Sequence, residues 1–188
     1  MKQLSRPARR ALLVVHVSVS VGWLGLTTGL LALGVTAAVS GSAAAAEASY
    51  RSMQVFGDWL ILPIALASLV SGLVLSLGTR WGLARHRWVV TKFWLTLAAT
   101  AATAFSLRPA IDDAARAVAS AEPVGAAATD LVVAPSVATA LYVFVTAISV
   151  LKPWGLTRRG RRAHDTGRSP GVGISGRRTQ PASDSLAP

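Results

Sequence analysis

Four long apolar stretches constrain this chain more than any other feature. They cover residues 11–38, 58–78, 88–107 and 131–151, in approximate bounds, of a 188-residue sequence. Each is close to the length of about 20 residues that a helix needs to cross the hydrocarbon core of a bilayer. Backbone polar groups must be paired internally in lipid, so the stretches are predicted to be helices. The predicted fold is therefore an all-α membrane protein, a four-transmembrane-helix bundle within residues 1–152.

Basic residues alternate along the chain relative to these spans. They precede span one, separate spans two and three, and follow span four, whereas the other two connections are poor in Lys and Arg. Cytoplasmic loops are enriched in these residues, so we predict a bacterial cytoplasmic (inner) membrane protein with both termini in the cytoplasm. The basic residues are Lys2, Arg6, Arg9 and Arg10, then Arg80, Arg85 and Arg87, then Lys152, Arg158, Arg159, Arg161 and Arg162.

Residues 153–188 form a segment rich in Gly, Ser, Arg and Pro. It has too few apolar side chains to offset the entropy of ordering, so a disordered basic cytoplasmic tail is predicted. The arginines at 158–162 are expected to rest on anionic headgroups. Because the positive charge flanks the spans, the net charge of +11 indicates topology and lipid contact rather than nucleic-acid binding.

The residue inventory excludes several kinds of chemistry. Cysteine is absent, which excludes disulfides, thiolate nucleophiles and Cys-ligated zinc or iron–sulfur centres. The spans carry no carboxylate pair, and the chain has no His-Glu-x-x-His motif, so we predict that it is not an enzyme. His16 is the only histidine within a span, which disfavours a bis-His haem. Met1 and Met53 are the only methionines, too few for a Met-rich copper path.

Two polar stripes at helical spacing occur within the spans. Span one carries His16, Ser20 and Trp23, followed by Thr27, and span three carries Lys92 and Thr96, followed by Thr100 and Thr103. His16 and Lys92 would lie at similar depth, about 7 Å inside the cytoplasmic boundary. We expect spans one and three to pack together, with these side chains facing the interior.

Two interpretations of His16 and Lys92 stay open at this stage. In the first, the aliphatic side chain of Lys92 extends toward the membrane surface, so that its ammonium lies among the lipid headgroups. A neutral His16 then forms a hydrogen bond with Ser20 or with a backbone carbonyl. In the second, the two residues form an intramembrane site for a ligand, a metal or a proton, as ionisable groups within spans often do. His16 is the candidate metal ligand in that case, and copper the candidate cofactor.

Small residues and one charge pair complete the candidate sites. Ser18, Gly22, Gly25 and Gly29 share a face of span one, which suits close helix packing against another span or, alternatively, a homodimer or another membrane-protein partner. Asp58 begins span two and Arg108 ends span three on the same side, so an outer-face ion pair is predicted. Residues 110–119 are expected to form a short external helix.

Three short motifs resemble those of small bacterial integral-membrane proteins related to copper-resistance protein D. The first span contains His16, Trp23 and Gly25 in a His…Trp-x-Gly pattern. Span two ends in the Ser-Gly-Leu sequence of residues 71–73, and span three runs from Lys92 to an Arg-Pro pair at residues 108–109. The resemblance covers spans one to three and implies a four-helix unit, with His16, Trp23, Gly25 and Lys92 as the family-like positions.

Two functions follow as hypotheses. The favoured one is a non-enzymatic structural or accessory component of the membrane, because nothing in the spans forms a reaction centre. The alternative is a copper- or ligand-handling membrane protein that acts through an intramembrane site near His16 and Lys92.

Overall fold

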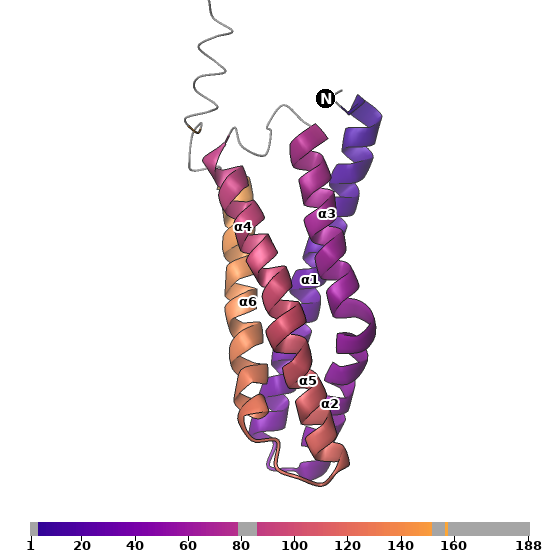
Figure 1. Ribbon diagram of the computed structural model, residues 1–188, viewed down its shortest axis with the longest axis vertical. Coiled ribbons are helices and arrows are strands. Elements are labelled where there is room, and N and C mark those ends of the chain that lie inside the picture. The colour runs from indigo at the N-terminus through magenta and orange to yellow at the C-terminus, as the bar shows by residue number, and fades with distance from the viewer. Residues whose placement is uncertain (1–3, 79–85, 152–156, 158–188) are drawn as a thin grey trace, which may run out of the picture.

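The computed structural model describes residues 4–78, 86–151 and 157. In this part of the chain, long helices lie roughly side by side (Figure 1). Four helical spans are long and apolar enough to cross a membrane: Arg6–Val39, Ala43–Gly78, Arg87–Ala119 and Ala126–Leu151. The all-α four-helix architecture predicted from the sequence is confirmed. The predicted tail, residues 153–188, lies outside the described residues except for Thr157.

The first and fourth spans are single helices, and the second and third each contain a π-helical turn. Span one is α1 (Arg6–Val39) and span four is α6 (Ala126–Leu151). Span two consists of α2 (Ala43–Phe56), the π turn η1 (Gly57–Ile61) and α3 (Leu62–Gly78). Span three consists of α4 (Arg87–Ala102), the π turn η2 (Thr103–Leu107) and α5 (Arg108–Ala119).

Glycine allows the chain to reverse direction at one end of the bundle. Gly41 and Gly125 both have φ of +61°, a left-handed conformation that side chains with a Cβ rarely adopt. Ser42 follows the first of them and caps α2, since its hydroxyl accepts a hydrogen bond from the amide of Ala45 at 3.4 Å. Gly125 directly precedes α6. These short connections make successive spans antiparallel neighbours.

The packing order follows the order of the spans in the sequence. The helix α1 packs against α2, α3 and α6, and α4 packs against α3 and α6. Among the described helices, α1 and α4 are therefore not a closely packed pair, and they lie across the bundle from one another. The expected packing of spans one and three is wrong, because short connections bring sequence neighbours together and leave the first and third spans on a diagonal.

Two helices extend well beyond the predicted spans 58–78 and 88–107. Span two begins at Ala43 and span three continues to Ala119, so the predicted external helix is continuous with the span as α5. At 1.5 Å per residue, span two is about 50 Å long, which exceeds the ~30 Å hydrocarbon core. The extensions are stable as helices because α2 and α5 pack against each other.

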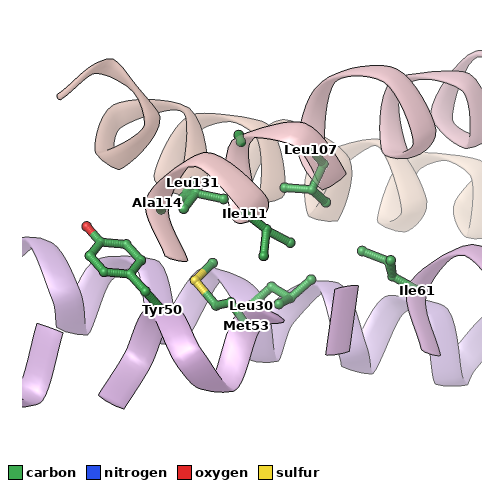
Figure 2. Packing of buried hydrophobic residues seen from close by; sticks show 9 residues of the cluster. Leu30, Tyr50, Met53, Ile61, Leu107, Ile111, Ala114 and Leu131 are labelled. Atoms are coloured by element: carbon green, nitrogen blue, oxygen red, sulfur yellow. The ribbon is translucent and has the colours of Figure 1, made fainter. Parts of the chain in front are cut away.

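The main apolar core lies in this extended half of the bundle. Figure 2 shows side chains from α1, α2, α5 and α6 converging there, including Leu30, Met53, Ile111 and Leu131. All four are 0–1% exposed. The complete cluster is Leu30, Tyr50, Met53, Ile61, Leu107, Ala110, Ile111, Ala114 and Leu131. A smaller cluster of Trp23, Ala65 and Ala99 lies nearer the opposite end, which we call the basic end: there α1 and α4 begin and α3 and α6 end.

Candidate functional site

His16 is held between α1 and α3 by the Ser-Gly sequence at residues 71–72. Its Nδ1 lies 2.9 Å from the Ser71 hydroxyl oxygen. The Ser71 hydroxyl oxygen also lies 3.2 Å from the carbonyl oxygen of Ser68, so this hydroxyl bridges the imidazole ring and the backbone of α3. A Cβ added at Gly72 would lie 3.0 Å from the imidazole Cε1, so glycine provides the space for the ring.

Lys92 reaches across to α6. Its ammonium donates a hydrogen bond to the hydroxyl of Ser149, and that hydroxyl donates to the carbonyl of Val145 at 2.7 Å. Lys92 is half-buried and directed at a neighbouring helix. Neither interpretation of Lys92 named this partner, because Ser149 belongs to the fourth span.

His16, Ser71, Lys92 and Ser149 nevertheless belong to one layer, with one side chain from each span. Trp23 of α1 stacks on Tyr142 of α6, and His16 and Ser149 each lie about two turns from that contact toward the basic end. Hydrogen bonds to Ser71 and Ser149 join α3 and α4 to the same level. We call these four residues the basic layer.

A second polar contact lies one turn deeper. The hydroxyls of Ser20 on α1 and Ser68 on α3 are 2.9 Å apart and hydrogen-bonded. Thr96 occupies the corresponding turn of α4 and is half-buried, and its carbonyl accepts a hydrogen bond from Thr100 at 2.9 Å. The predicted polar stripes of spans one and three therefore both face the bundle interior.

Trp23 and Tyr142 form the next level of the interior. Their ring centroids are 4.5 Å apart, with the ring planes tilted by 43°. The Tyr142 hydroxyl interacts with the hydroxyls of Thr103 and Thr27, so one contact joins α1, η2 and α6. Trp23 is only 3% exposed, and its indole N–H has no hydrogen-bond partner among the described residues. Polar side chains thus extend from the basic end to the edge of the apolar core.

The predicted packing face of small residues on α1 is only partly used. A Cβ added at Gly22 would lie 2.9 Å from the Ile64 side chain, so Gly22 packs against α3. Ser18, Gly25 and Gly29 are exposed, and a Cβ added at either Gly25 or Gly29 would meet nothing within 4 Å. Those three residues do not pack against another span within the described part of this chain, and their use in a homodimer or with another membrane protein stays a prediction. The tight contact on α1 is at Gly34, where an added Cβ would overlap the carbonyl of Leu131.

The predicted ion pair between Asp58 and Arg108 is present at 3.4 Å. It joins η1 to the first residue of α5, and the two side chains are 40% and 38% exposed. Such an exposed pair contributes little to stability, about 0–1 kcal/mol. It orients spans two and three, but it lies within continuous helices rather than at the span ends that the sequence suggested.

Span four supplies two residues that sequence reasoning missed. Tyr142 and Ser149 are seven residues apart and so lie on one helical face, the face that meets the two polar stripes. Neither side chain is charged at neutral pH. An uncharged polar residue in an apolar helix does not by itself indicate a site, because its partners on the other helices are not known from the sequence. His16 and Trp23 on span one are also seven residues apart. This matching spacing on spans one and four is the sequence signal that could have identified Tyr142 and Ser149.

Groups of three or more His, Asp or Glu side chains close enough to hold a metal ion do not occur among the described residues. Comparison with protein-family models, curated proteins and solved structures found no match to this chain. The resemblance to relatives of copper-resistance protein D therefore stays a prediction that rests on the motifs themselves. What the structure adds is that the Ser-Gly motif of span two meets the His16 of span one.

Proposed function

We propose that this chain is a non-enzymatic, multi-pass component of a bacterial cytoplasmic membrane, with a structural or accessory role. The observation that carries the proposal is the use of polar side chains inside the bundle. His16, Ser20 and Lys92 each bond to a serine of a neighbouring helix. In lipid, helices associate through close packing and interhelical hydrogen bonds of this kind. Side chains that could carry chemistry are thus committed to holding the spans together.

The cytoplasmic orientation of both termini is part of this proposal, and it is supported by the alternating basic segments. Reporter fusions test it directly. A fusion after Gly160 should report the cytoplasm, and an insertion between Gly41 and Arg51 should report the opposite side. A reporter after Gly160 that is active only outside the cytoplasm would contradict the orientation.

A structural role makes a distinctive prediction about loss of function. In a strain that lacks the chromosomal copy, variants such as Ser71→Ala and Ser149→Ala should lose complementation only to the extent that they lose folded protein in the membrane. The amount of folded protein is measured by protease resistance of membrane fractions. A variant that is fully folded and fully inactive would contradict the structural role.

Ligand or copper handling is the second candidate, and the geometry of the basic layer favours it enough to test. His16 and Lys92 bond to serines at the same level of the bundle, on α3 and α6. A neutral imidazole whose Nδ1–H is held by a hydrogen bond is a common metal-ligand arrangement. Copper sensitivity of the deletion strain provides the test: restoration by the wild-type chain but not by folded His16→Ala would favour this candidate.

A further inference from the structure

We propose that the bilayer surface away from the basic end lies at the Asp58–Arg108 ion pair, with Trp59 among the lipid headgroups and Phe105 at the edge of the hydrocarbon. The helices α2 and α5 then stand outside the bilayer, in water, and we call them the cap. The inference rests on the proposed membrane location of the chain and goes beyond it, because it gives the depth of each span. It follows from helix length, from exposed charge and from two exposed aromatic rings.

The first observation is the length of spans two and three up to the ion pair. From Asp58 to Gly78, where α3 ends, the helix measures about 30 Å at 1.5 Å per residue. From Arg87, where α4 begins, to Arg108 it measures about 32 Å. Each length matches the ~30 Å hydrocarbon core without any contribution from the cap.

Tilting does not bring the whole of span two into the hydrocarbon core. The span Ala43–Gly78 has 36 residues, which correspond to about 50 Å of helix. A helix of that length would need a tilt of more than about 50° to fit within a core of about 30 Å, whereas transmembrane helices are tilted by roughly 0–40°. One end of span two therefore lies outside the hydrocarbon, and the exposed side chains indicate which end.

The second observation is that the exposed faces change in character at the ion pair. Toward the basic end, α3 exposes large apolar side chains, namely Leu66, Val70, Val74 and Leu77. Beyond the pair, α2 and α5 each expose an ion pair within the helix, namely Arg51 with Glu47 at 2.7 Å, and Arg116 with Asp113. These four charged side chains are 45–75% exposed. Because a charged side chain that faces hydrocarbon is costly, the exposed face of the cap belongs in water.

The interior of the cap is also typical of helices that fold in water. Met53 of α2 and Ile111 of α5 are 0% and 1% exposed and belong to the main apolar core (Figure 2). A buried apolar face combined with a charged outer face is the pattern of a surface helix in a globular protein. The hydrophobic effect stabilises such a core in water, whereas lipid provides no comparable force between helices.

The third observation is the pair of aromatic rings beside the ion pair. Trp59 directly follows Asp58 in η1, and Phe105 lies three residues before Arg108 in η2, one turn nearer the basic end. The two residues are 77% and 84% exposed. Tryptophan is enriched at membrane–water interfaces, because its ring is apolar and its N–H is polar. The wholly apolar Phe105 ring lies deeper, as the order of headgroup and hydrocarbon requires.

Single cysteines test the position of this boundary, because the natural chain contains none. Ser52→Cys on α2 and Asp113→Cys on α5 place a thiol at exposed positions of the cap. Leu66→Cys on α3 and Ala98→Cys on α4 are the matched controls, exposed between the ion pair and the basic end. Each full-length variant is placed in nanodiscs of phosphatidylglycerol and phosphatidylcholine, which leave both bilayer surfaces open to a charged maleimide.

The two cap cysteines should react at least about tenfold faster than the two controls, because a thiol in lipid stays protonated and out of reach of a charged reagent. Circular dichroism identifies the variants that keep the helical content of the wild type, and only those are compared. Labelling of both cap cysteines as slow as that of the controls would overturn the proposal. Equally fast labelling of all four would overturn it too, since lipid would then cover neither half.

The depth of Trp59 provides a second measurement that needs no substitution in the cap. Lipids brominated either close to the headgroup or near the end of the acyl chains quench the emission, and the difference between wild type and Trp59→Phe isolates Trp59. Trp94→Phe is the control, because Trp94 is 60% exposed and lies about 10 Å along α4 from Arg87, inside the hydrocarbon. The shallow bromine should quench Trp59 at least about twice as strongly as the deep one, with the reverse order for Trp94. Stronger quenching of Trp59 by the deep bromine rejects the boundary.

These measurements keep the boundary separate from the proposed function. Nanodiscs expose both surfaces, so the labelling reports depth and is independent of orientation. A reporter after Gly160 that is active only outside the cytoplasm would reverse the orientation, and fast labelling of the cap would still support the boundary. Slow labelling of Ser52→Cys and Asp113→Cys in variants that complement fully would reject the boundary and leave the structural role in place.

Discussion

Gly34 of α1 lies directly against the backbone carbonyl of Leu131 on α6. A Cβ at position 34 would overlap that oxygen and would approach the Leu131 carbonyl carbon to 3.1 Å. Gly34 is buried beside the apolar core, and the carbonyl belongs to a helix that cannot shift alone. The closest approach of the first and fourth spans is thus set by a single missing methyl group.

Gly34→Ala should therefore destabilise the folded bundle by about 1–3 kcal/mol, because overpacking forces two helices apart. Gly29→Ala on the same helix is the matched control, since its added Cβ meets nothing within 4 Å. It should change stability by no more than about 0.5 kcal/mol. Unfolding in mixed micelles by titration with denaturing detergent measures both. Equal effects of the two substitutions would show that the α1–α6 contact is looser than described.

Ser71→Ala removes the hydroxyl that lies 2.9 Å from the Nδ1 of His16, and with it a hydrogen bond between α1 and α3. We expect a loss of about 0.5–2 kcal/mol, the range of interhelical hydrogen bonds in membranes. Ser136→Ala is the control, because the exposed Ser136 hydroxyl bonds only to the Val132 carbonyl of its own helix. The same micelle unfolding assay compares them. A neutral Ser71→Ala would mean that His16 finds another partner at no cost.

Met53→Ala tests the apolar core outside the predicted spans. Met53 is 0% exposed among side chains of α1, α2, α5 and α6, so truncation leaves a cavity that should cost about 2–4 kcal/mol. Val55→Ala on the same helix is the control, because Val55 is 60% exposed and should change stability little. Thermal unfolding followed by circular dichroism gives both values. A small effect at Met53 would indicate that α2 is not firmly docked.

Tyr142→Phe and Trp23→Phe should differ although the two rings are in contact. Tyr142→Phe removes a hydroxyl that interacts with Thr27 and Thr103, and it should cost about 0.5–1.5 kcal/mol. Trp23→Phe removes an indole N–H that has no hydrogen-bond partner among the described residues. No hydrogen bond is therefore lost, and the change in stability reflects the smaller ring volume alone. Tryptophan fluorescence and micelle unfolding follow both variants. If Trp23→Phe loses more stability than the smaller ring volume accounts for, the indole N–H has a partner, such as a bound water.

The fold and one face of each span could be predicted from the sequence, because apolar length and polar spacing are local properties. The stripe containing His16 and Trp23 faces the interior, as does the one containing Lys92 and Thr96. The partners could not be predicted, since Ser71 and Ser149 are ordinary residues until the register between helices is known. The helices that pack against span one could not be predicted from the depth of residues in the membrane. Two residues at the same depth can belong to helices on opposite sides of the bundle.

The small-residue pattern shows a different limit of sequence reasoning. Gly25 and Gly29 have the spacing of a packing motif but face away from the other spans, whereas Gly34 makes the tight contact. Spacing identifies a face, and the position of that face relative to the bundle depends on the larger side chains of α1, namely Trp23 and Leu30, which occupy the interior. The ends of spans two and three were predicted wrongly because the charged residues Asp58 and Arg108 suggested that the spans end there. The two charges pair with each other, and the helices continue past them.

The two π turns have a consequence for how the length of this chain can vary. A π turn corresponds to an α-helix with one residue inserted, so the faces on either side of it already accommodate the extra residue. Deleting one residue within Thr103–Leu107 would restore an ordinary helical turn, and Lys92 and Ile111 would keep their present directions. The same deletion in the middle of α4 or α5 would rotate everything beyond it by about 100°. Natural variants that are one residue shorter should therefore have their gap at η1 or η2.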